Sequence, residues 1–117
     1  MSKHLSLKQA RLIKQHRYIL KRLATSNAKN RTLILKNAPS ELYQALNLIF
    51  KLLSEKQLKL SEKQTKKLKR HSNTIRKTSK LSTGAIKRKL QNQKGGFLPA
   101  ILSAALPLVG SLIKAII

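Results

Sequence analysis

The sequence predicts an all-α fold: a small bundle of short amphipathic helices, a basic helical arm, and a hydrophobic C-terminal helix after a Gly-Gly hinge. Three observations predict this fold. Apolar residues recur at helical spacing, helix-capping residues precede the periodic runs, and the composition changes abruptly at Gly95-Gly96. They divide the chain into a helical bundle (1–57), a basic segment (58–94) and a hydrophobic tail (95–117).

The charge of the chain indicates a polyanionic partner. The sequence has 26 Lys and Arg residues against 3 acidic ones, so its formal net charge is +23. A compact domain with so few carboxylates repels itself, and we expect nucleic acid, or else an anionic membrane surface, to balance it. The sequence contains no cysteine, no paired carboxylates, no HExxH motif and no Gly-rich phosphate loop. It therefore predicts no enzyme activity, no cofactor and no metal site.

Two helices are predicted before the first proline. From Leu5 to Ala24, apolar residues at helical spacing alternate with cations, which predicts one basic amphipathic helix capped by Ser2 or Ser6. A second, short helix begins after a cap at Ser26 or Asn27 and carries the apolar run 33–35. The chain then breaks at Asn37-Ala38-Pro39.

The third helix is the most core-like segment. We expect Ser40 to cap it, with Glu41 placed favourably in its first turn. A wide apolar stripe follows, made of Leu42, Ala45, Leu46, Ile49, Phe50 and Leu53. Packing of these stripes predicts an antiparallel bundle, which is marginally stable at this size.

The basic segment has helical signals but few apolar residues. Ser61 and Gln64 fit a capping box, and the helix that follows is expected to run to about Thr78. Its two large apolar residues, Leu68 and Ile75, share one face. A last basic helix starts at Ser82, with Ile86 and Leu90 facing inward. Because helices this poor in apolar residues gain little from packing, we expect them to order fully only on a polyanion.

The cations of the basic segment are candidate phosphate contacts. Each Lys or Arg that neutralises a DNA phosphate releases a condensed counterion. The segment lacks aromatic residues for base stacking, which favours double-stranded over single-stranded DNA, without readout of sequence. The alternative is a solvated, partly disordered charged segment. The predicted contact residues are Lys63, Lys66, Lys67, Lys69, Arg70, Arg76, Lys77, Lys80, Lys87, Arg88 and Lys89.

Surface and packing roles are predicted for two histidines and two tyrosines. His16 and His71 are expected to lie on helix surfaces among cations. Tyr18 and Tyr43 are expected to pack as amphipathic side chains.

The tail from Phe97 to Ile117 predicts a hydrophobic helix of membrane-spanning length that Pro107 kinks. Its few polar or small positions, with Pro107, form one narrow seam: Ser103, Pro107, Gly110, Ser111 and Lys114. This pattern favours a helix in a membrane interface or in a self-assembly, and the alternative is docking on the bundle. The predicted membrane-contacting residues are Phe97, Leu98, Ile101, Leu102, Leu108, Leu112 and Ile113.

The layout resembles known viral proteins. A basic body, Gly-Gly and an aliphatic Leu-Pro-rich tail resemble the precursor of the adenovirus core protein mu, or protein X. The pattern "LS…Q…LKRH…IRK" and the joint "QKGGFLP" are similar to small late proteins of adintoviruses and Maverick/Polinton elements. The adenovirus resemblance implies cleavage by a virion cysteine protease after Gly96, at a site made of Gln93, Gly95, Gly96 and Phe97.

Together these features imply a non-enzymatic virion core protein, located in the virion and the host nucleus, that binds and condenses double-stranded DNA. The resemblance implies a protease-releasable tail, with membrane or capsid contact through that tail. A competing hypothesis is a membrane-active protein whose C-terminal helix perturbs bilayers. A third is a structural subunit of a host nucleoprotein particle.

Overall fold

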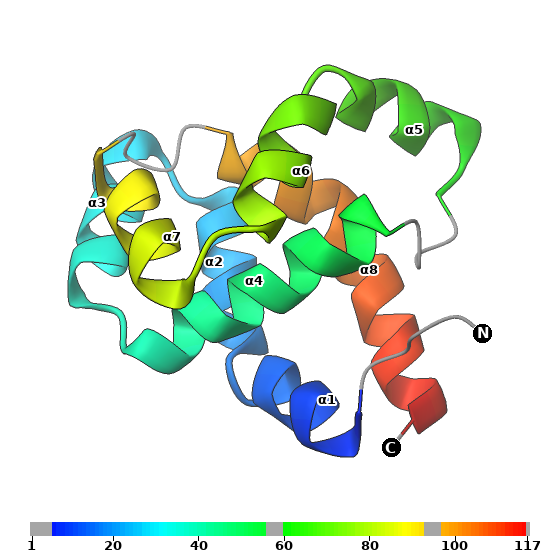
Figure 1. The fold of residues 1–117 in the computed structure, drawn as a ribbon, viewed down its shortest axis with the longest axis horizontal. Coiled ribbons are helices and arrows are strands. Elements are labelled where there is room, and N and C mark those ends of the chain that lie inside the picture. Colours follow the sequence, from blue (N-terminus) through cyan, green and yellow to red (C-terminus); the bar gives the residue numbers. More distant parts are fainter. Residues whose placement is uncertain (1–5, 56–59, 93–96, 117) are drawn as a thin grey trace.

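The described parts of the chain are helical throughout (Figure 1). The computed structural model describes residues 6–55, 60–92 and 97–116, which contain eight helices and no strand. This confirms the predicted all-α fold. The body measures 38 × 30 × 24 Å along its principal axes. The helices are α1 (Leu7–Gln15), α2 (Arg17–Thr25), α3 (Ala28–Asn37), α4 (Ser40–Ser54), α5 (Glu62–Lys69), α6 (Ser72–Ser79), α7 (Thr83–Asn92) and α8 (Leu98–Ile116).

The single N-terminal helix predicted from Leu5 to Ala24 is wrong, because the chain bends at His16 and forms α1 and α2. There the His16 backbone N–H bonds to the Ile13 carbonyl at 3.1 Å. In a continuous helix the His16 backbone N–H would bond to the Leu12 carbonyl. Here the His16 ring Nδ1–H donates to that carbonyl instead, at 3.0 Å. The bend therefore leaves no carbonyl unpaired at Leu12.

The predicted caps are largely confirmed. Ser6 caps α1 through a capping box with Gln9, whereas the alternative, Ser2, and Leu5 lie outside the described residues. Asn27 caps α3 by accepting from the Asn30 N–H at 2.9 Å. The predicted cap at Ser40 is wrong. Ser40 is the first residue of α4, Pro39 holds the cap position, and the Ser40 hydroxyl donates to Glu41 Oε1 at 3.1 Å.

One core joins all three predicted regions of the chain. The whole α4 stripe is buried, as predicted, and α6 and α7 pack on α4. On the opposite side α8 packs on α2, with further contacts to α1 and α5. Buried residues from α1 to α8 form one apolar cluster. Tyr43 lies within it and donates its hydroxyl to the Leu35 carbonyl, whereas Tyr18 is 71% exposed, so its predicted packing role is wrong.

The tail has the docked arrangement that was its alternative interpretation. α8 runs through Pro107 without ending. Burial on both sides of the proline offsets the missing backbone bond, because Ala105 and Val109 are both buried. The predicted polar seam is confirmed: Ser103, Pro107, Gly110, Ser111 and Lys114 are all exposed.

The chain contains a similar helical unit twice, and α5, α6 and α7 each begin 55 positions after α1, α2 and α3. The first repeat comprises α1–α4 and the second α5–α8. Ser61 caps α5 through a box with Gln64, as Ser6 does with Gln9, and both His16 and His71 have φ −106° and ψ 10°.

The packing of the two repeats is partly reciprocal. In the second repeat Ser82 Oγ accepts from the Ala85 N–H, as Asn27 accepts from the Asn30 N–H in the first. Helix α4 packs on α6, and the corresponding α8 packs on α2. Helices α3 and α7, which correspond to each other, are in contact. Exchange of the repeats preserves these contacts, whereas the contacts of α7 with α4 and of α1 with α8 have no counterpart of similar extent.

A buried hydroxyl in the second repeat gives a test of the core. Thr78 is fully buried, and its Oγ1 has no hydrogen-bond partner among the described residues. The corresponding residue of the first repeat is Leu23, which is also fully buried. We expect Thr78→Val to raise the free energy of unfolding by about 1 kcal/mol, because it removes an unsatisfied polar group.

Thermal unfolding followed by circular dichroism measures this gain, which corresponds to a rise in Tm of about 4 °C. The matched control is Thr65→Val on α5, where Thr65 is exposed and no gain is expected. A lower Tm for Thr78→Val would mean that the hydroxyl is satisfied in solution.

Candidate nucleic-acid interface

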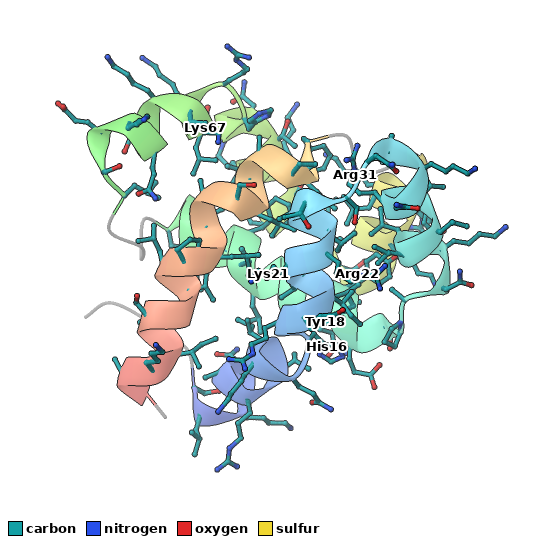
Figure 2. All side chains as sticks on the ribbon, turned by 180° about the vertical axis from the view of Figure 1, so that it is seen from behind. His16, Tyr18, Lys21, Arg22, Arg31 and Lys67 are labelled. Atoms are coloured by element: carbon teal, nitrogen blue, oxygen red, sulfur yellow. The ribbon has the colours of Figure 1, made fainter. Side chains whose placement is uncertain are left out.

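Helix α5 presents four cations to solvent. The capping box fixes its start: the Ser61 N–H donates to Gln64 Oε1 at 2.9 Å, and the Gln64 N–H donates to Ser61 Oγ at 3.2 Å. Leu68 is the buried residue of this helix. The exposed cations are Lys63, Lys66, Lys67 and Lys69, and Figure 2 shows Lys67 directed away from the body.

The continuous helix predicted from Ser61 to Thr78 is wrong, because the chain bends at Arg70-His71 and starts again as α6. The His71 N–H bonds to the Leu68 carbonyl at 2.9 Å, three residues back instead of four. The bend turns α6 onto α4, so that Ile75, Thr78 and Ser79 become buried.

The cations of α6 and of the turns at its two ends point away from this packing. Arg70, Arg76, Lys77 and Lys80 are exposed. Asn47 of α4 holds the end of the helix, since its Nδ2 lies 3.4 Å from the Ser79 carbonyl and 3.3 Å from that of Leu81. The expectation that α6 gains little from tertiary packing is therefore wrong. Small residues and one amide supply contacts that a count of large apolar residues does not include.

Helix α7 completes the basic surface. Ile86 and Leu90 are buried, as predicted, and Gln91 Nε2 donates to the Leu35 carbonyl of α3 at 3.3 Å. Lys87 and Arg88 are exposed and Lys89 is half-buried. All eleven predicted contact cations thus reach solvent, nine from α5–α7 and two from the turns that join them, and the apolar residues of these helices belong to one core.

Positive charge is the main chemical feature of the candidate interface. The cations of α5–α7 carry ammonium and guanidinium groups that can donate to phosphate oxygens, and these helices contain no aromatic residue. Among residues 6–55, 60–92 and 97–116 no group of three His, Asp or Glu could hold a metal ion. The pKa of Tyr43 is raised by burial of the phenol.

The predicted histidine roles are half right. His71 is partly exposed, whereas His16 is 9% exposed and forms the bend described above, so its assignment as a surface residue is wrong.

The predicted joint and tail residues occupy different environments. Gln93, Gly95 and Gly96 lie outside the described residues. The Phe97 ring meets the Phe50 ring with centroids 6.2 Å apart and planes at 60°. Of the predicted membrane-contacting residues, four are buried (Leu98, Ile101, Leu102 and Ile113), and the rest (Phe97, Leu108 and Leu112) are half-buried.

Helix α8 still has the composition of a membrane span. Its window Leu98–Ala115 is long and apolar enough to cross a bilayer by length and composition, with a mean hydropathy of 1.7. Of that window, 39% is buried within the protein. A core helix passes the same test, so this window alone does not distinguish the two environments.

The sequence did not lead us to predict the cations of the first repeat as contact residues. Lys8, Arg11 and Lys14 on α1, and Lys21 and Arg22 on α2, are exposed. Figure 2 shows Lys21 and Arg22 on α2, which lies on the face hidden in Figure 1. The signal that finds them is the repeat itself, since "LS.KQ" and a His eleven residues after its Leu occur in both halves.

Comparison of the chain with models of known protein families, with characterised proteins and with solved structures finds no match.

Proposed function

We propose that this chain is a virion core protein that binds and condenses double-stranded DNA without reading its sequence. The observation that supports the proposal most strongly is the outward placement of the cations on α5–α7 over a shared core. With 26 basic residues and 3 acidic ones, the chain cannot neutralise this surface internally. Phosphates can, and each contact releases a counterion from the duplex.

The form of the surface favours DNA backbone contacts over base contacts. The cations are spread over three short helices instead of lining one long recognition helix, and no stacking residue accompanies them on α5–α7. Such a surface positions a protein on any duplex with similar affinity. In the virion and the host nucleus this would serve packaging of the genome.

The alternative function is perturbation of membranes through α8. The apolar window Leu98–Ala115 favours it. To act on a bilayer, however, α8 would have to separate from α2, on which it packs. Leu20 of α2 and Ile101 of α8 are both buried in the common core. The DNA proposal requires no such opening, and it is the one that we adopt.

One experiment separates the two functions. The purified chain is titrated onto two unrelated duplexes of 40 base pairs and, in parallel, onto dye-loaded liposomes of anionic lipid. We expect both duplexes to be retarded in a gel at the same protein concentration, with no dye release at that concentration. Dye release without retardation of either duplex would favour the membrane function.

The hydrophobic tail is proposed to be cut from the basic body by a virion cysteine protease after Gly96. Since α8 packs on α2, we expect the cut tail to stay bound until the core opens. Mass spectrometry of denatured mature particles should detect a fragment that begins at Phe97, and Gly95→Val should abolish it by placing a branched side chain at the joint. Finding only the intact chain would refute the cleavage.

A further inference from the structure

The two repeats carry matching cations. Five exposed cations of the first repeat correspond to exposed cations of the second, 55 positions further along the chain. The charge is retained at these positions although the residue type changes at three of them. The pairs are Lys8 with Lys63, Arg11 with Lys66, Lys14 with Lys69, Lys21 with Arg76, and Arg22 with Lys77.

These two cation sets lie on different sides of the molecule. Helix α6 lies on the face turned to the viewer in Figure 1, and α2 lies on the face turned to the viewer in Figure 2. Helices α1 and α5 lie at opposite ends of the same view (Figure 1). The reciprocal packing explains this arrangement, because α6 covers α4 on one side and α8 covers α2 on the other.

The first repeat adds further contacts for a polyanion. Lys8 and Arg11 of α1 and Lys51 of α4 line an open groove of about 800 Å³ between these two helices. Tyr18 is 71% exposed on α2 beside Lys21 and Arg22, as Figure 2 shows. A tyrosine at this place can donate its hydroxyl to a phosphate of a duplex held by the neighbouring cations.

We propose that the two repeats form two equivalent duplex-binding surfaces, so that one chain holds two segments of double-stranded DNA together. The inference rests on the proposed function and specifies how binding leads to condensation. A single segment cannot serve both surfaces, because a duplex with a persistence length of about 150 bp does not turn around a body only 24 Å thick. Each surface therefore engages a separate segment.

A bridging assay tests this with matched variants. One duplex is attached to beads, and recruitment of a second, fluorescent duplex by limiting protein is measured. The first variant changes Lys8, Arg11, Lys14, Lys21 and Arg22 to Gln, and the second changes Lys63, Lys66, Lys69, Arg76 and Lys77 to Gln. Both lose five charges from exposed positions, and circular dichroism checks that both keep the fold.

We expect each variant to be retained on the beads by its remaining surface but to recruit the second duplex at least tenfold less than the unmodified chain. A variant in which Lys8, Lys14 and Lys21 become Arg should recruit it normally. A mixture of the two Gln variants should not restore recruitment, because bridging requires both surfaces in one chain.

Several outcomes would overturn the inference. One is normal recruitment of the second duplex by the first Gln variant. Another is recruitment restored by the mixture of the two Gln variants, which would indicate bridging through an oligomer. Retention of the unmodified chain without recruitment would refute the bridging alone. Failure of the unmodified chain to be retained on the beads would refute the proposed DNA binding itself.

Discussion

Stopping the chain at Gly96 is expected to abolish its cooperative thermal unfolding. Helix α8 contributes five large buried side chains to the core: Leu98, Ile101, Leu102, Val109 and Ile113. Loss of a buried Leu or Ile side chain costs about 2–5 kcal/mol, so removal of the helix costs about 10 kcal/mol or more. A chain of 117 residues is stabilised by only about 6–18 kcal/mol in total.

Circular dichroism during heating measures this loss. The truncated chain should show reduced helicity and a broad melt, and addition of a peptide of residues 97–117 should partly restore the transition. The full-length variant Ser103→Ala serves as the control, because Ser103 lies on the exposed seam of α8 and its replacement should leave the Tm unchanged. An unaltered transition in the truncated chain would show that α8 is not part of the core in solution.

The second large effect concerns the affinity for DNA. In a chain whose first-repeat cations Lys8, Arg11, Lys14, Lys21 and Arg22 are already Gln, changing Lys66, Lys67, Lys69, Arg70, Arg76 and Lys77 to Gln is expected to lower the affinity for duplex DNA by about a thousandfold at low salt. Up to six phosphate contacts of the remaining surface are then lost. All six side chains are exposed, so the fold should be retained. Fluorescence anisotropy with a labelled duplex in 50 mM salt measures the loss.

A charge-retaining variant supplies the control for this effect. Replacing the four lysines of that set with Arg keeps the charge and should keep the affinity within a few-fold. If these six changes left the affinity equal to that of the first-repeat Gln variant, α5 and α6 would be excluded as contact surfaces. Loss of affinity in the Arg variant would point to a shape-specific site instead.

The local features of the fold were predictable from the sequence. The caps at Ser6, Asn27 and Ser61 were predictable because each satisfies backbone donors only three residues away. The stripe of α4 and the polar seam of α8 were predictable because helical spacing alone sorts their residues between core and solvent.

The bends and the tail packing were not predictable by the same rules. At His16 and His71 the chain bends without proline or glycine, through a shift of one backbone hydrogen bond. The docking of α8 on α2 joins residues far apart in sequence, and a helix apolar on most sides fits a core and a membrane equally well. Only the matched order of helices in the two repeats indicates that α8 corresponds to the core helix α4.

The candidate interface was half predicted. Cations off the apolar face of a helix must reach solvent, so the exposure of Lys66, Arg76 and Lys87 follows from the helical pattern. The cations of the first repeat were not predicted as contact residues, because they were interpreted only as the polar side of a bundle helix. Comparing the two halves of the sequence identifies them without a structure.

The salt dependence of DNA binding tests the central claim most directly. The affinity of the unmodified chain is measured for two duplexes of unrelated sequence between 50 and 300 mM salt. Phosphate contacts predict a linear plot of log affinity against log salt with a slope of about −5 or steeper, the same for both duplexes. A shallow slope, or affinities that differ tenfold or more between the two sequences, would contradict binding through backbone charge.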